Sequence, residues 1–319
     1  MKYIEDLKVG DAITETYLCK EKRSGTTKNG ADYFLVTLQD KTGVLEGNIW
    51  DVNSPGINEF DKKDYVEVSG VIKEYKGKNQ ITINSLRVAD SGSINLEDYI
   101  PTTDKNVNEM YNELLNIIAT IKAPYMKKLL EMYFVKDESF KKRFCYHSAA
   151  KSVHHGFAGG LLEHTLSVTK TCDFISKQYD YLDRDLLLTA AIFHDIGKLA
   201  ELSPYPENDY TDAGQMLGHI VMGYNLLSNS MRQIEDFPEV KKNELLHCIL
   251  AHHGEYEYGS PKKPSIAEAI ALNFADDMDA KLETMKEVMS KVKGNDLSWQ
   301  GFNYLFDSNI RKTSEGYDE

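Results

Sequence analysis

Cysteine, long apolar runs and a leader-like start are all scarce in this 319-residue chain. The four cysteines stand singly at Cys19, Cys145, Cys172 and Cys248, with no CxxC spacing among them. Cysteines scattered in this way are typical of reduced thiols in a cytosolic protein. The longest nearly apolar run, residues 186–193, is far too short to span a bilayer, and the acidic first residues lack the apolar segment of a secretory signal. We therefore expect a cytoplasmic protein without a membrane partner.

An excess of basic charge is also missing. The formal net charge is −13, which by itself argues against nucleic acid as a partner. Residues 1–90, however, hold 13 Lys and Arg against 15 Asp and Glu, so most of the acidity lies in residues 91–319. Carboxylates there can serve metal ions or solubility. The bulk charge therefore does not decide the partner.

The length fits two or three domains, and residues 10–90 are rich in short segments of β-type composition. Five segments alternate or are enriched in strand-forming residues between turn-like sequences, namely residues 12–19, 33–38, 43–50, 65–74 and 80–88. Residues 53–60 leave room for a short helix after the third strand. This is the plan of the OB-fold, a five-stranded Greek-key barrel. We predict an OB-fold domain over residues 1–90.

The predicted barrel carries basic and aromatic side chains where OB-folds bind a strand, on the face of strands two and three and the first and fourth loops. The basic residues expected in these loops are Lys20, Lys22, Arg23, Lys28, Lys73, Lys76 and Lys78. The aromatic residues on or beside this face are Tyr33, Phe34, Trp50 and Tyr75. Exposed rings stack on bases at about 1–3 kcal/mol each. The alternative is that rings belong to the core and lysines to solvated turns, and alternation allows only one of Tyr33 and Phe34 to face outward.

Beyond residue 90 the pattern changes. Residues 91–104 are rich in Ser, Gly, Asn and Asp and are predicted to be a linker. The apolar periodicity then becomes helical, and the helices we expect cover residues 107–121, 125–133, 161–178, 185–194, 215–229, 239–252 and 265–292. Together they predict an all-α bundle over residues 105–306, followed by a polar tail over 307–319.

Histidine is distributed unevenly, since all nine histidines lie in the segment that begins at His147 and ends at His253. Structural histidines would rarely cluster so, and histidine is the commonest metal ligand. The most informative segment is residues 186–198, an apolar helix that ends with the adjacent pair His194 and Asp195. A buried carboxylate beside a histidine is costly unless something compensates it. A divalent cation bound by both side chains would compensate.

Further polar residues take inward-facing positions on the neighbouring predicted helices. His164 shares the spacing of the apolar residues around it; alone it would more often be a satisfied core residue, but the pair His194–Asp195 favours a ligand role. The other candidates, with two choices between neighbours left open, are His219, His252 or His253, and Asp276 or Asp277.

This ordered set of His, His-Asp, His, His-His and Asp resembles the HD-domain superfamily of metal-dependent phosphohydrolases. With residues 149–164 ahead of the set and a predicted OB-fold in front, the chain resembles the YhaM family of bacterial 3′–5′ exoribonucleases over nearly its full length. The resemblance implies a helical HD domain and a Mn²⁺-type site of one or two ions. The residues that match the four core HD ligands are His164, His194, Asp195 and Asp276.

The resemblance also implies further site residues. His219 and either His252 or His253 match the positions that hold a second metal, with Asp195 bridging the two ions. Some cyclic-dinucleotide phosphodiesterases carry an acidic ligand four residues before the first histidine, where this chain has Gly160. Residues 254–259 also depart from their Gly-Tyr-Pro signature. An HD enzyme acting on nucleotides or cyclic dinucleotides is therefore the second hypothesis, and a non-catalytic nucleic-acid-binding protein is the third.

Residues next to the predicted metal site are candidates for contact with a phosphate. Lys198 lies within one turn of Asp195 and would neutralise developing charge; the alternative is pairing with the C-terminal dipole of a helix. Lys151, His154 and His155 precede the first metal helix and are candidates for holding a substrate phosphate, with a local structural role as the alternative. We predict a metal-dependent 3′–5′ exoribonuclease whose barrel holds single-stranded RNA. Single-stranded DNA is a further candidate substrate, and a homo-oligomer is left open.

Overall fold

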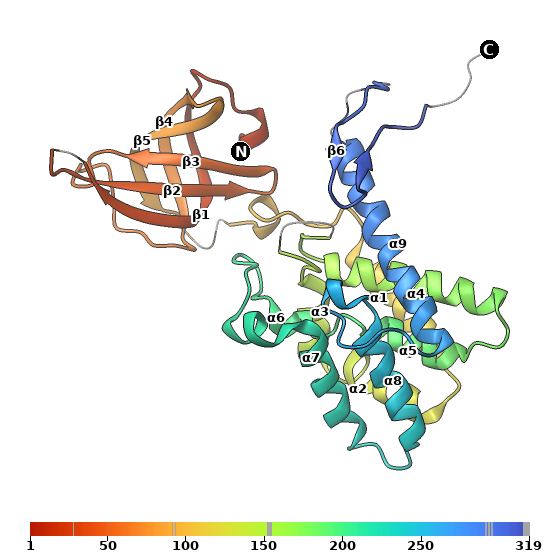
Figure 1. Ribbon diagram of the computed structural model, residues 1–319. Coiled ribbons are helices and arrows are strands. Elements are labelled where there is room, and N and C mark those ends of the chain that lie inside the picture. Colours follow the sequence, from red (N-terminus) through yellow and green to blue (C-terminus); the bar gives the residue numbers. More distant parts are fainter. Residues whose placement is uncertain are drawn as a thin grey trace. The chain divides into compact units, whose positions relative to one another are not determined.

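The computed structural model, drawn in Figure 1, describes residues 1–314 except 28, 91, 93, 152–154, 291, 293 and 295. It divides into two compact units, Met1–Thr102 with Tyr205–Asn208, and Thr103–Pro204 with Asp209–Glu319. Within the described residues, none of the helices combines the length and apolarity needed to cross a membrane. All four cysteines are buried and unpaired. None of the four forms a disulfide in this structure.

The first unit contains a closed five-stranded barrel, which confirms the predicted OB-type domain. Its strands are β1 (Ala12–Thr26), β2 (Asp32–Asp40), β3 (Gly43–Ile49), β4 (Tyr65–Tyr75) and β5 (Lys78–Val88). Their order is β1-β2-β3-β5-β4, and β1 pairs with both β2 and β4. Only the pairing of β3 with β5 is parallel. Closure leaves the barrel without a free sheet edge.

The barrel core follows from strand alternation. In β4 the side chains of Val66, Val68 and Ile72 are buried between half-buried neighbours, because successive residues point to opposite faces. They pack with Ile81 of β5 in one apolar cluster. Burial of each such side chain is worth about 1.5–3 kcal/mol. Gly70 is required in β4, since a Cβ there would lie 2.3 Å from the backbone oxygen of Thr82.

Three local predictions for the barrel were wrong. Strand β1 extends to Thr26, because residues 21–26 pair with β2 although their composition is unfavourable for a strand. The β4–β5 connection is only the two-residue turn of Lys76 and Gly77, both with positive φ. The helix expected at residues 53–60 is replaced by turns and a bridge from Ile57 to Leu86. The Asn-Ser-Pro-Gly run in that segment favours turns over a helix.

The second unit is helical, as predicted, apart from a short hairpin. Its helices are α1 (Val107–Ala119), α2 (Pro124–Phe134), α3 (Glu138–Tyr146), α4 (Gly160–Gln178), α5 (Arg184–Phe193), α6 (Lys198–Glu201), α7 (Asp212–Met231), α8 (Glu239–Ala251) and α9 (Ala267–Ser290). Helices α3 and α6 were not predicted, because each is short and mostly polar. The hairpin strands β6 (Phe302–Asn303) and β7 (Ser308–Asn309) lie on either side of the predicted boundary at residue 306.

Helix α5 is the centre of this bundle and delivers the polar pair. The Asp183 side chain caps its N-terminus by accepting from the backbone N–H of Leu186 at 3.1 Å. From Leu186 to Phe193 every side chain is buried, and α5 packs against α4, α8 and α9. The helix ends at Phe193, so His194 and Asp195 directly follow the C-terminal end of this buried helix.

Candidate metal centre and nucleic-acid interface

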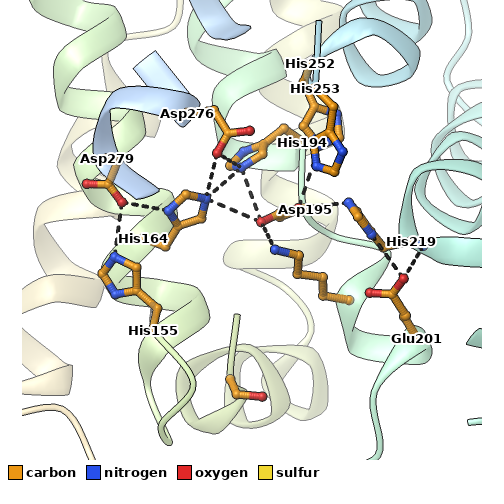
Figure 2. A network of polar contacts seen from close by, with 12 residues as sticks. His155, His164, His194, Asp195, Glu201, His219, His252, His253, Asp276 and Asp279 are labelled. Atoms are coloured by element: carbon orange, nitrogen blue, oxygen red, sulfur yellow. Dashed lines mark hydrogen bonds and ion pairs between the residues drawn. The ribbon is translucent and has the colours of Figure 1, made fainter. Parts of the chain in front are cut away.

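Asp195 lies at the centre of a cluster of histidines (Figure 2). Its Oδ2 is 3.4 Å from Nε2 of both His164 and His194. Its other oxygen, Oδ1, is 3.4 Å from Nε2 of His219 and 3.8 Å from Nε2 of His252. The two oxygens of one buried carboxylate thus face two separate groups of imidazoles.

Five histidines around Asp195 share one arrangement, in which Nδ1 is held by an oxygen. In three of them the partner is a backbone oxygen: that of Ala191 for His194 (2.7 Å), that of Ile249 for His252 (2.7 Å) and that of Tyr258 for His253 (2.8 Å). In the other two it is a carboxylate: that of Asp279 for His164 (2.7 Å) and that of Glu201 for His219 (3.1 Å). An oxygen without a proton can only accept, so Nδ1 is the donor in each case. In the neutral ring the lone pair then lies on Nε2, which is the form that binds metal.

This arrangement leaves polar atoms that a cation would satisfy. Asp195 Oδ1, His219 Nε2 and His252 Nε2 are buried and have no hydrogen-bond partner within the described residues, and orphaned acceptors of this kind are costly. Moreover, Nε2 of His164 lies 3.0 Å from Nε2 of His194. Both atoms are acceptors when their Nδ1 atoms carry the protons. A cation between them removes the conflict, so the residues present fit a metal.

The potential ligands fall into two groups that share Asp195. One is His164, His194 and Asp276, and the other is His219, His252 and His253. Asp276 Oδ1 lies 3.2 Å from His164 Nε2 and 3.7 Å from His194 Nε2. Asp277 instead pairs with Lys281 at 2.8 Å and is half exposed. Of the two choices left open by spacing, the geometry therefore selects Asp276, whereas both His252 and His253 belong to the second group.

Burial and the surrounding carboxylates shift the pKa values of these histidines in opposite directions. Burial lowers the pKa of His252 well below its usual range and also lowers the pKa of His253, so both rings stay neutral. For His164, burial acts to lower the pKa, but the carboxylates of Asp195, Asp276 and Asp279 outweigh it and raise the pKa well above normal. The carboxylates thus attract a positive charge to this ring, whether a proton or a metal ion.

Four residues of the cluster line an open cavity of about 460 Å³, namely His164, Asp195, His253 and Asp276. Lys198, the first residue of α6, also lines it and places Nζ 2.7 Å from Asp195 Oδ2. Burial acts to lower the pKa of Lys198, but the attraction of Asp195 outweighs it and raises the pKa, so the side chain is an ammonium. Lys198 begins the four-residue helix α6 and pairs directly with Asp195.

The three candidate phosphate contacts ahead of α4 are placed differently. His155 is buried, lines the cavity and has its Nε2 3.1 Å from Asp279 Oδ2. Lys151 pairs with Asp209 at 2.6 Å and is half exposed. His154 lies outside the described residues. Of the two members of this set that the structure describes, His155 lines the cavity and Lys151 does not.

Sequence reasoning missed two carboxylates that hold the outer nitrogens of metal-site histidines. Asp279 lies one helical turn after Asp276 on α9 and bonds to His164. Glu201 ends α6 and accepts hydrogen bonds from the backbone N–H and the ring of His219 at 2.9 and 3.1 Å. The i, i+3 spacing of Asp276 and Asp279 was the only available signal for the first of them.

The basic residues predicted for the barrel loops lie mainly on strands. Lys20, Lys22 and Arg23 belong to β1, Lys73 to β4 and Lys78 to β5, whereas Lys76 is in the turn between the last two strands. Lys28 lies outside the described residues. Lys22 is engaged within the barrel, since its Nζ donates to the Phe60 oxygen at 2.5 Å and lies over two aromatic rings.

The predicted aromatic residues divide into core and surface. Phe34 packs against the barrel core, with its ring 6.0 Å from that of Phe60. Tyr33 is half-buried and its ring lies 5.4 Å from the ring of Trp50, which is 54% exposed. Tyr75 is 59% exposed at the tip of the β4–β5 hairpin. Trp50 and Tyr75 are therefore the rings most available to a ligand.

Comparison with known proteins finds a matching family for each of the two units. The HD domain family matches residues 161–281, and the OB-fold nucleic acid binding domain family matches residues 19–89. The 3′-5′ exoribonuclease YhaM of Bacillus subtilis is 33% identical over 287 residues, covering 89% of this chain and 90% of the relative. The proteins of the same name from Bacillus velezensis and Bacillus licheniformis are 33% and 32% identical over the same coverage.

Among solved structures, the second OB-fold domain of replication protein A from Methanococcus maripaludis is similar over 30% of this chain and 98% of its own length, at 22% identity and a TM-score of 0.24. The likeness to the curated relatives, in contrast, extends along nearly the full chain and includes both units. With an OB-type barrel ahead of an HD domain, this protein belongs to the YhaM family.

Proposed function

We propose that this protein is a metal-dependent 3′–5′ exoribonuclease that shortens single-stranded RNA, with single-stranded DNA as a further candidate substrate. The observation that carries the proposal is the convergence of five imidazoles and two carboxylates in one cluster, part of which lines an open cavity, in a chain of the YhaM family. The cleavage polarity follows the name of the relatives.

The donor set indicates which ion the cluster would hold. His164, His194 and Asp276 would hold one ion with Asp195 Oδ2, and the three remaining histidines of the cluster would hold a second with Asp195 Oδ1. Mixed imidazole and carboxylate ligands favour Mn²⁺ or a neighbouring transition metal over Mg²⁺. When bound, such ions lower the pKa of coordinated water and neutralise phosphate oxygens.

The protein's own side chains would orient the substrate. We assign to Asp195 the central catalytic role, because its two oxygens join both histidine groups. Lys198 holds its ammonium at the cavity wall and would bind an oxygen of the scissile phosphate. His155 lines the same cavity and is a second candidate for a phosphate contact.

The barrel would retain the strand while the helical unit cleaves it. Exposed Trp50 and Tyr75 offer stacking surfaces, and Lys73, Lys76 and Lys78 are exposed around the β4–β5 turn. Tethering two sites in one chain raises the effective concentration of substrate at the second site. Repeated cleavage of one RNA molecule is the expected consequence.

One observation disfavours the cyclic-dinucleotide part of the second hypothesis, which is an HD enzyme that acts on nucleotides or cyclic dinucleotides. A Cβ on Gly160 would lie 2.0 Å from the backbone oxygen of His155. This position therefore has no room for the additional acidic ligand of those enzymes. The packing around α4 excludes that ligand here, and the chain keeps only the shared HD set.

The test is a ladder assay with RNA labelled at its 5′ end. Wild-type protein with Mn²⁺ should shorten the labelled RNA progressively. Asp195→Ala should abolish this shortening, while its affinity for RNA stays within about twofold of wild type. His247→Ala is a matched control, since His247 accepts from the backbone N–H of Ser265 at 2.9 Å and takes no part in the cluster. Intact RNA with every divalent transition metal would reject the proposal.

A further inference from the structure

A single carboxylate behind the cluster holds three side chains. Asp279 Oδ2 accepts from Nδ1 of His164 at 2.7 Å and from Nε2 of His155 at 3.1 Å, and its Oδ1 accepts from the hydroxyl of Ser167. Its side chain is 13% exposed. Figure 2 shows His164 between Asp279 on one side and Asp276 and Asp195 on the other.

These contacts have two possible meanings. His155, His164 and Asp279 are close enough to hold a third ion. However, Nε2 of His164 already faces Asp195 and Asp276, so an ion on Nδ1 would require the ring to lose both protons. A hydrogen bond from Nδ1–H to Asp279 needs no such loss, and carboxylates commonly hold the outer nitrogen of a ligand histidine.

We propose that Asp279 is a positioning residue for the metal centre, which fixes the ring of His164 with Nε2 inward and holds His155 at the cavity wall. Removal of the carboxylate would free the His164 ring to rotate and to change tautomer. Ser167 completes the arrangement by restraining the carboxylate itself. Such outer-shell partners typically change metal affinity by about 10- to 100-fold.

The test measures Mn²⁺ binding by calorimetry on metal-free full-length protein, so it is independent of RNA cleavage. Asp279→Ala and Asp279→Asn should raise the dissociation constant for Mn²⁺ by about 10- to 100-fold, with Asn at the lower end, and should leave the number of bound ions unchanged. Glu268→Gln is the control, because Glu268 is a buried carboxylate of the same helix that accepts from the Asp183 N–H at 2.7 Å. The dissociation constant of Glu268→Gln for Mn²⁺ should stay within about twofold of the wild-type value.

Two results would overturn this role. An unchanged dissociation constant in Asp279→Asn, whose side chain has the size of the original, would show that the carboxylate does not position the ligand. The loss of one bound ion per chain would instead show that Asp279 is itself a ligand of a third metal.

A separate observation concerns the rim of the cavity. Two aromatic side chains in its wall remain open to solvent, with Tyr258 68% and Phe274 66% exposed. They come from different elements, the 3₁₀ turn Tyr256–Tyr258 and helix α9. Large exposed rings beside a polar cavity are surfaces on which a planar group can stack.

Both rings are tied to the metal cluster through the backbone. The oxygen of Tyr258 accepts from Nδ1 of His253 at 2.8 Å, and Phe274 lies two residues before Asp276 on α9. The loop before Tyr258 is packed tightly against α9, since a Cβ on Gly254 would lie 2.6 Å from the Asn273 amide. The backbone segments that carry both rings are therefore held next to the cluster.

We infer that Tyr258 and Phe274 form a stacking subsite for the base of the terminal nucleotide, an inference that rests on the proposed nuclease function. A nucleobase offers a flat apolar face whatever its sequence, so the subsite would add affinity without base specificity. Stacking of one base corresponds to about a 5- to 150-fold gain in affinity.

The test compares RNA with a normal and an abasic terminal nucleotide. Wild-type protein should show a KM about 5- to 150-fold higher for the abasic substrate. Phe274→Ala and Tyr258→Ala should raise KM for normal RNA towards that of abasic RNA, with kcat within about twofold. Phe174→Ala and Tyr181→Ala are matched controls, because these rings are 62% and 71% exposed elsewhere on the helical unit. They should leave KM unchanged for both substrates.

The outcomes separate the subsite from the function. Equal KM values for the two substrates in wild-type protein, or an equal rise for both in the variants, would overturn the stacking subsite and leave the nuclease intact. Failure of wild-type protein to cleave either RNA would overturn the nuclease function and this subsite with it.

Discussion

Metal binding should stabilise this protein against heat. The folded chain buries Asp195 Oδ1, His219 Nε2 and His252 Nε2 without partners in its described part, and a bound cation satisfies all three. A ligand at 100 times its dissociation constant stabilises the folded state by about 2.7 kcal/mol. In a domain of 150–250 residues each kcal/mol raises the unfolding midpoint by about 2–4 °C. Saturating Mn²⁺ should therefore raise the midpoint by about 5–11 °C.

The assay is differential scanning calorimetry of protein stripped of metal and then titrated with Mn²⁺. Asp195→Ala should lose most of the shift, because it removes the oxygens that face both histidine groups. His247→Ala should keep the shift, since that ring lies outside the cluster. If Mn²⁺, Fe²⁺, Co²⁺, Ni²⁺ and Zn²⁺ all leave the midpoint unchanged, or if Asp195→Ala shifts as much as wild type, the metal centre is refuted.

Three further predictions concern the barrel, a surface ion pair and the core. Trp50→Ala should weaken RNA binding by about 5- to 150-fold in fluorescence anisotropy, whereas Trp299→Ala, at 66% exposure, should not; equal effects would refute the barrel interface. Burial acts to raise the pKa of Asp173, but hydrogen bonds from Lys177 and Arg184 outweigh it and lower the pKa below 3.8. The carboxylate thus stabilises the fold above pH 3.8. Asp173→Asn should therefore lower the free energy of unfolding in urea by about 1 kcal/mol at pH 7, and by less as the pH falls below 3.8. A difference in unfolding free energy that does not change with pH would contradict this. Leu187→Ala, at a fully buried position of α5, should lower the unfolding free energy by about 2–5 kcal/mol, and a loss under 1 kcal/mol would contradict the packing.

The sequence predicted best those elements whose secondary structure depends on their own residues and not on pairing with another segment. Helix α5 was expected at residues 185–194 and covers Arg184–Phe193, because a nearly apolar run follows soon after a capping aspartate. The ordered His and Asp residues could be grouped because the apolar helices around them are legible in the sequence. His164, His219 and Asp276 lie within three of these helices, and the pairs His194–Asp195 and His252–His253 directly follow the ends of α5 and α8. Strand β1 could not be bounded, because its second half is a strand only through pairing with β2.

What the sequence could not supply is the layer behind the ligands. Whether the outer nitrogen of an imidazole meets a backbone oxygen or a carboxylate depends on how neighbouring helices pack. Glu201 reaches His219 because α6 and α7 pack together and Gly218 breaks the helical backbone just before that histidine. Asp279 could have been found from its turn-spacing after Asp276, whereas nothing local to Glu201 indicated its partner.

The central claim is that the histidines and Asp195 converge to bind cations, and anomalous diffraction tests it most directly. Crystals of the full-length protein soaked in Mn²⁺ and measured at the manganese edge should show one or two anomalous peaks within about 2.0–2.3 Å of the Nε2 atoms and Asp195 oxygens. One peak is expected among His164, His194 and Asp276, and the second is expected among the other three histidines. Peaks confined to surface carboxylates, with none at Asp195, would contradict the account.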